Sequence, residues 1–148
     1  MDDKKIQIKK LGNKDLFLFE KLIVMFQDIF EMENRVVAKV SYLENLLLQP
    51  GFIALVIMYE DEVVGGLTAY ELPMYYAEYS ELYIYDIAIK PEFQRKGFGT
   101  RLLSALKKYC KENRIKEFFV EVHEEDKHAL NFYHSRGGKA EKVVHFNF

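Results

Sequence analysis

The sequence has little that would tie it to a membrane, to the cell exterior or to a metal. Cys110 is the single cysteine, which excludes an intramolecular disulfide framework and is typical of a reducing compartment. No apolar run is long enough to span a bilayer, and the first ten residues are mostly charged or polar, unlike a signal peptide. We therefore expect a soluble, cytoplasmic protein.

Linkers and strong charge are also lacking. Three prolines and no repeat or low-complexity tract interrupt the 148 residues, which predicts a single domain over residues 1–148. The formal net charge of -2 gives no positive field for nucleic acid or anionic lipid, so neither partner is expected. The four histidines lack the spacing of a zinc site, and we predict no metal.

Hydrophobic periodicity indicates an α/β chain with a mixed sheet. Alternating and continuous apolar runs predict strands, and apolar residues at helical spacing predict amphipathic helices. The strands are expected at 6–11, 52–59, 63–72, 82–89, 115–122 and 143–148, and the helices at 16–30, 40–47, around 102–110 and at 126–136. The order is β-α-α-β-β-β-α-β-α-β, in which 82–89 and 118–122 can pair in parallel through a crossover helix.

The most informative stretch is Gln94-Arg95-Lys96-Gly97-Phe98-Gly99-Thr100, between a buried strand and an amphipathic helix. Its two glycines let successive backbone N–H groups converge at a helix N-terminus, which favours a phosphate. A dinucleotide-binding fold would need a third glycine, and a nucleotide P-loop would need a different spacing. An ordinary strand-to-helix turn remains the alternative from these residues alone.

Two sets of residues resemble a known family. Gln94-x-x-Gly97-x-Gly99, together with Ala129-Leu130-Asn131-Phe132-Tyr133 and then Gly137, resembles the GNAT acetyltransferase superfamily. More narrowly, the segments that resemble aminoglycoside 3-N-acetyltransferases are 53–56, 63–67, 82–88 and His145-Phe146.

The resemblance implies a sheet that splays between the strands near Ile89 and Phe118, with coenzyme A in the gap. Backbone groups of Ile87, Ala88 and Ile89 would hold the pantetheine arm. The implied coenzyme-binding set also includes Asn131 and the turn residues Gln94, Arg95, Lys96, Gly97, Phe98, Gly99 and Thr100.

Two residues are candidates for catalysis. An alkylammonium needs about 4.6 kcal/mol to lose its proton at neutral pH, so a base or a carboxylate leading through water is expected. Asp86, inside an otherwise apolar strand, is the candidate for that base or for a grip on the substrate ammonium. Tyr133 is the candidate acid for the departing thiolate. The alternatives are an aspartate satisfied by backbone donors and a tyrosine of the core.

Acidic residues suggest a rim for a cationic acceptor, although a solvated charge run is the alternative. The predicted substrate-binding residues are Glu31, Glu33, Tyr85, Asp86, Glu121, Glu124 and Asp126.

The expected function is transfer of an acetyl group from acetyl-coenzyme A to a small polycationic amine, by direct attack in a ternary complex. An aminoglycoside, acetylated at its 3-N position, is the leading acceptor. The alternatives are a polyamine, a protein or peptide amine, and a non-catalytic module that senses acyl-coenzyme A. A homodimer built on the terminal strand belongs to this last alternative.

Overall fold

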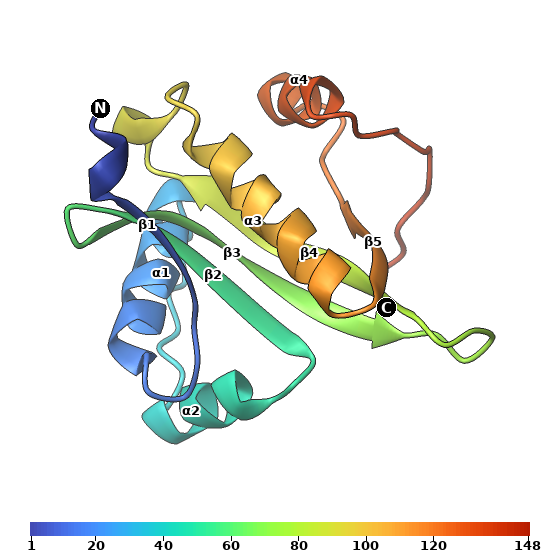
Figure 1. Ribbon diagram of the computed structural model, residues 1–148, viewed down its shortest axis with the longest axis horizontal. Coiled ribbons are helices and arrows are strands. Elements are labelled where there is room, and N and C mark those ends of the chain that lie inside the picture. Colours follow the sequence, from blue (N-terminus) through green and yellow to red (C-terminus); the bar gives the residue numbers. More distant parts are fainter.

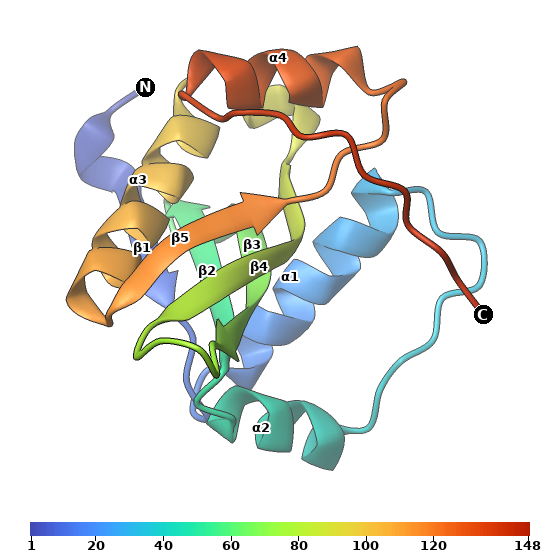
Figure 2. The same cartoon turned by 90° about the vertical axis from the view of Figure 1, so that its right-hand side faces the viewer.

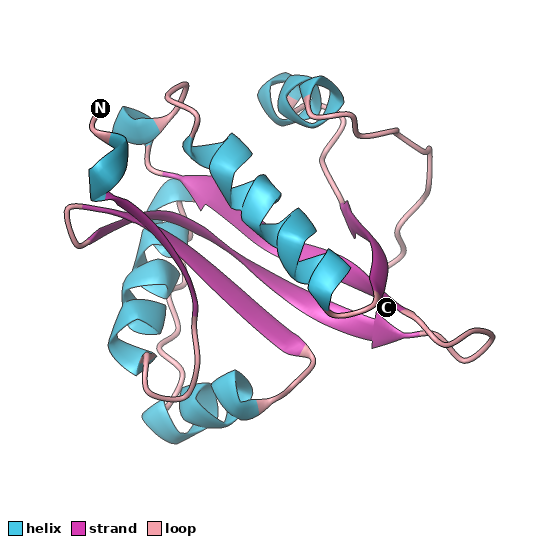
Figure 3. Ribbon diagram, in the orientation of Figure 1, coloured by secondary structure: helices cyan, strands magenta, loops and turns pink.

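The computed structural model describes residues 1–148 as a five-stranded mixed sheet with helices on both faces (Figures 1 and 3). None of these helices has the length and apolar character needed to cross a bilayer. In chain order the elements are the 3-10 helix Asp3–Lys5, β1 Ile6–Lys10, α1 Leu16–Ile29, α2 Val40–Leu48, β2 Phe52–Tyr59, β3 Glu62–Pro73, β4 Ser80–Ile89, the 3-10 helix Pro91–Phe93, α3 Phe98–Glu112, β5 Ile115–Val120 and α4 Lys127–Ser135.

The sheet runs in chain order from β1 to β5, and two hydrophobic clusters lie on its opposite faces. Strands β1 to β4 pair antiparallel, whereas β5 returns through α3 to pair parallel with β4. Strand β2 is buried on both faces, which explains its continuous apolar run. One face packs against α1 and α2, and the other packs against α3.

Pairing between β4 and β5 stops well before β4 ends. The last registered pair is Ile84 with Val120, and β4 continues alone on that side to Ile89. Its antiparallel pairing with β3 continues to Ile89 but is interrupted by a bulge at Tyr85, which has no partner between Ile84 and Asp86. The sheet therefore opens between the carboxyl ends of β4 and β5, as the family resemblance implies.

The predicted terminal strand at residues 143–148 is wrong. After Gly138 no residue makes a backbone hydrogen bond, and Val143, Val144, Phe146 and Phe148 remain largely exposed. A strand needs a neighbouring backbone, and the chain leaving α4 crosses past the end of β5 instead of running along its free edge (Figure 2). Apolar alternation alone could not reveal this path.

Helix α1 lies directly on the sheet at Gly66. A Cβ atom added there would come within 2.5 Å of both Leu22 Cδ1 and the Leu55 carbonyl oxygen. Because a backbone carbonyl cannot move aside cheaply, only glycine fits between this helix and this strand.

We therefore predict that Gly66→Ala destabilises the fold by about 1–3 kcal/mol, because of overpacking between α1 and β3. Thermal unfolding should show a melting temperature lowered by several degrees. Gly12→Ala is the matched control, since a Cβ at Gly12 meets nothing closer than 3.8 Å. Equal melting temperatures for the two variants would contradict the close packing.

Candidate functional site

The turn before α3 is shaped to present backbone N–H groups. Arg95 and Gly97 both have a positive φ, of 62° and 84°, and Gly97 is the N-cap residue of α3. Such left-handed dihedrals on alternate residues are typical of a concave anion-binding backbone. At Gly97 the dihedral is the constraint, because a Cβ there would meet no atom within 4 Å.

Every backbone N–H from Arg95 to Thr100 lacks an acceptor within the protein. The first N–H with a partner is that of Arg101, which donates to the Gly97 carbonyl at 3.0 Å. Consecutive free donors at the positive end of a helix dipole are the arrangement that binds phosphate. The structure thus provides the donors that the sequence analysis expected of this turn.

The side chains of the turn contribute less to an anion site than its backbone. Gln94 Nε2 donates to the Ile89 carbonyl at 2.9 Å, which fastens the turn to the end of β4. Phe98 is fully buried against Tyr59 and Phe93, so only its backbone faces the turn. Two cationic side chains of this region already have partners within the protein. Lys96 donates to the Glu92 carbonyl at 2.7 Å, and Arg101 pairs with Asp3 at 2.8 Å.

A cleft of about 260 Å³ continues from the turn between α3 and α4. Arg136 lines it and donates to Thr100 Oγ1 at 3.3 Å. Lys107 on α3 also lines it. The remaining lining residues are Thr100, Leu103, Ser104 and Ser135. Sequence reasoning missed Arg136 and Lys107 because the cleft exists only once α4 packs beside α3.

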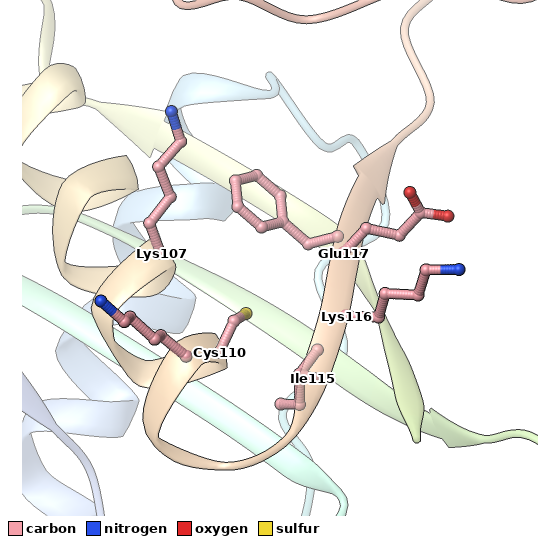
Figure 4. Close-up of a pocket in the computed structure, with 7 residues that line it drawn as sticks. Lys107, Cys110, Ile115, Lys116 and Glu117 are labelled. Atoms are coloured by element: carbon pink, nitrogen blue, oxygen red, sulfur yellow. The ribbon is translucent and has the colours of Figure 1, made fainter. Parts of the chain in front are cut away.

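A second groove, of about 420 Å³, lies between α3 and β5 (Figure 4). Cys110 and Ile115 form part of its apolar lining, and Lys107 and Lys116 stand on opposite sides of it. Burial raises the pKa of the Cys110 thiol to about 11, which keeps this thiol protonated and non-nucleophilic at neutral pH. The groove therefore contains no activated nucleophile.

Helix α4 lies beyond the carboxyl end of β5 and carries Tyr133 (Figure 2). The neighbouring Phe132 ring packs where a Cβ on Gly99 would come within 3.1 Å, which fixes α4 against the start of α3. Burial, followed by the nearby negative charge of Asp126, raises the pKa of Tyr133 to about 12. The phenol is therefore a proton-carrying group throughout the physiological range. Asn131 is exposed on the same helix.

The opposite face of the sheet carries a row of aromatic rings that the sequence analysis missed. Phe52, Tyr70 and Tyr83 are successive cross-strand partners, and Phe119 on β5 is the next. The Tyr83 and Phe119 rings are stacked with centroids 5.0 Å apart, and the half-exposed Tyr85 ring stands edge-on to Tyr83 at 5.9 Å. Four strands contribute to the row, so only the sheet register brings these rings together.

Asp86 lies beside this row. It pairs with Thr68, which in turn pairs with Ala54 of the α1 face, and the bulge at Tyr85 places Asp86 on the same face as Tyr83. Burial raises the pKa of the Asp86 carboxyl, and no cation or hydrogen-bond donor offsets this effect. The alternative of an aspartate satisfied by backbone donors is therefore wrong, and the group is poised to receive a cation or a proton.

The predicted acidic residues are dispersed, and only some adjoin the aromatic row. Glu121, just after β5, accepts from the Tyr83 hydroxyl at 3.1 Å and is within 3.5 Å of His145 Nδ1. Glu31 and Glu33 lie exposed in the connection between α1 and α2, and Glu124 is exposed before α4. Asp126 Oδ1 accepts from the Ala129 N–H at 2.9 Å, so this carboxylate caps the N-terminus of α4.

The comparisons with known proteins identify this arrangement. The model of the acetyltransferase (GNAT) family matches residues 18–137. The chain belongs to this family. No curated protein matches the sequence of this GNAT chain.

Among solved structures, the GNAT chain is similar to aminoglycoside acetyltransferases. It is 38% identical to an aminoglycoside acetyltransferase, meta-AAC0020, from an uncultured soil metagenomic sample, with a TM-score of 0.95 over 99% of this chain and 97% of the other. That protein was also solved in complex with sisomicin. A second aminoglycoside acetyltransferase from an uncultured soil metagenomic sample is 33% identical, with a TM-score of 0.88 over 97% of both chains.

A more distant structure shows the shared fold. The aminoglycoside N-acetyltransferase AAC(6')-Iy, in complex with a bisubstrate analogue that joins coenzyme A to acetylneamine, is 14% identical with a TM-score of 0.81 over 97% of both chains. The family match and the closer structures establish the protein as an N-acetyltransferase, close to the aminoglycoside-modifying members of the GNAT family.

We predict that the Tyr133 phenol stays protonated in alkaline solution. At about pH 10.5 an ordinary tyrosine is roughly three-quarters ionised, because its pKa is about 10. Tyr133→Phe should therefore remove almost none of the tyrosinate absorbance of the folded protein at that pH, with free tyrosine as the standard and circular dichroism as the check on folding. Loss of most of one tyrosinate would mean that burial does not hold this proton.

Proposed function

We propose that this enzyme transfers an acetyl group from acetyl-coenzyme A to a primary amine of a small polycationic, aminoglycoside-like acceptor, with the 3-N position as the leading choice. The observation that carries the proposal is Asp86, a half-buried carboxylate with no counter-charge on the aromatic face of the opened sheet. Likeness to a protein solved with sisomicin supports an acceptor of this class.

The residues around the turn fit acetyl-coenzyme A. The free N–H groups of Arg95 to Thr100 suit its pyrophosphate, and the cleft lined by Lys107 and Arg136 offers cations for a further phosphate. The unpaired edge of β4 at Ile87, Ala88 and Ile89 can hydrogen-bond to pantetheine amides, and Asn131 would add a contact from α4. When bound, acetyl-coenzyme A supplies the acetyl group as an activated thioester.

Asp86 prepares the acceptor. A carboxylate in a half-buried site without a partner gains free energy when an ammonium approaches, so Asp86 attracts the acceptor amine. The same burial raises the affinity of Asp86 for a proton, which suits it to take one from the amine directly or through water. The neutral amine is then the nucleophile.

Tyr133 provides a proton for the leaving group, the thiolate of coenzyme A. The phenol carries its proton at neutral pH, as an ordinary tyrosine does, and is the donor we assign to the departing thiolate. Burial raises its pKa to about 12, which makes it a weaker acid, so this proton transfer costs free energy. Direct transfer in a ternary complex is favoured over an acyl-enzyme. The buried Cys110 has a protonated thiol and belongs to the hydrophobic cluster on the α3 face, opposite Asp86.

The acceptor surface combines rings and carboxylates. Tyr83 and Tyr85 offer aromatic faces and hydroxyl groups to the rings of an aminosugar, while Asp86 and Glu121 offer negative charge to its ammonium groups. Glu31, Glu33, Glu124 and Asp126 would extend the acidic surroundings. A single-charge amine would use only part of this surface.

The test is thiol release from acetyl-coenzyme A with gentamicin-type aminoglycosides, spermidine and basic peptides, beside a control without amine. We expect release that depends on the aminoglycoside, with lower activity on the other amines. The best acceptor being a peptide would overturn the proposed substrate class. Coenzyme binding without turnover of any amine would instead favour the alternative of an acyl-coenzyme A sensor.

Asp86→Asn should separate catalysis from stability. We expect kcat/KM for the best amine to fall about 10²- to 10⁴-fold, the usual contribution of a general base. Because burial raises the folded-state pKa of Asp86, its contribution to stability is present at low pH and is lost as pH rises through that pKa. The melting temperature at neutral pH should therefore hold or rise. Unchanged kinetics, or loss of activity only through unfolding, would remove Asp86 from the mechanism.

A further inference from the structure

Glu121 is held at one of its two carboxylate oxygens only. Tyr83 Oη donates to Glu121 Oε2 at 3.1 Å, and His145 Nδ1 lies 3.5 Å from the same oxygen. No side chain of the protein contacts Oε1 as a donor or a cation. Residues from β4, from the end of β5 and from the C-terminal segment thus meet at a single atom beside the aromatic row.

The contact between His145 and Glu121 is the polar side-chain contact that connects the C-terminal segment, residues 139–148, to the rest of the protein. The segment makes no backbone hydrogen bond, and its other side-chain contact, between His145 and Asn147, is internal. After leaving α4 it passes beyond the end of β5 (Figure 2). His145 therefore anchors the segment beside the proposed acceptor surface.

Both ring nitrogens of His145 face oxygen atoms. Nδ1 faces Glu121 Oε2, and Nε2 lies 3.2 Å from Asn147 Oδ1. Nδ1 can donate to Glu121 Oε2, and the ring is a cation beside this carboxylate whenever both nitrogens carry a proton. An exposed ion pair of this kind is weak, so a competing cation can displace one partner.

We propose that His145 is a specificity-determining residue that occupies Glu121 as an internal cation, which the ammonium group of a polycationic acceptor replaces. While the acceptor is bound, the C-terminal segment therefore lacks the contact between His145 and Glu121. Amines that offer a second ammonium to Asp86 displace His145 more readily than singly charged amines do. The inference rests on the proposed function, because it assigns Glu121 to the acceptor.

An imidazolium competes for Glu121 as a cation and a neutral imidazole does not, so the competition is tested at two pH values. The titratable groups around His145 are Glu121, Tyr83 and, further along β4, Asp86. Burial and the hydrogen bond to Glu121 raise the pKa of Tyr83, so its phenol stays neutral across this range. The carboxyl groups of Asp86 and Glu121 remain in a His145 variant, so a comparison with the wild type isolates the imidazole.

The experiment is calorimetric binding of a gentamicin-type aminoglycoside to wild-type protein and to His145→Gln, at about pH 6 and about pH 8.5, with KM measured alongside. At the lower pH we expect the variant to bind roughly two- to fivefold more tightly, the range of an exposed ion pair. At the higher pH the two proteins should bind the aminoglycoside with similar affinity. At each pH, kcat should be similar for the two proteins. Glu121→Gln should weaken binding at both pH values.

His134→Gln is the matched control, because His134 is exposed on α4 and its ring makes no hydrogen bond or ion pair. This variant should match the wild type at both pH values. Equal or weaker binding by His145→Gln at the lower pH would overturn the inference, as would unchanged binding by Glu121→Gln. Failure of the wild type to bind or acetylate any amine would instead refute the proposed function.

Discussion

The end of pairing between β4 and β5 at Ile84 and Val120 is the constraint on which the site depends. Parallel strands joined by a right-handed crossover place the start of α3 just beyond the carboxyl end of β4. Opening the sheet there leaves a free strand edge that leads to the free N–H groups of the turn at 95–100. Closing the sheet would satisfy that edge and remove the space between the turn and Tyr133.

Strand β4 contributes to both proposed binding surfaces, the one for the coenzyme and the one for the acceptor. Its unpaired edge faces the gap, while one of its faces carries Tyr83 and Asp86. These two residues are three apart and share a face only because the bulge at Tyr85 inserts an extra residue. A regular strand would send one of them into the core under α3, so the bulge places Asp86 on the same face as Tyr83, where we propose that the acceptor binds.

The sequence was informative where the signal is local. The glycine-bearing turn, the apolar run of β2 and the charged Asp86 in an apolar strand are visible in neighbouring residues, and the family resemblance correctly implied the opened sheet. Features that depend on register or packing were missed: the aromatic row needs the alignment of four strands, and the cleft at Lys107 and Arg136 needs α4 beside α3. The same limit produced the wrong terminal strand, since period-two apolarity does not say whether a partner strand exists.

The proposed acceptor surface lies beside the irregular segment 139–148, and a second irregular segment, residues 30–39, connects α1 to α2. Neither segment contributes to the turn at 95–100. Substitutions, insertions or extensions in either segment can accumulate during evolution without disturbing the sheet or the coenzyme-facing backbone. Among descendants of such a protein, the donor half would stay nearly constant while the acceptor half diverged. The fold thus allows a lineage to acquire new amine substrates by changing its loops and its last ten residues.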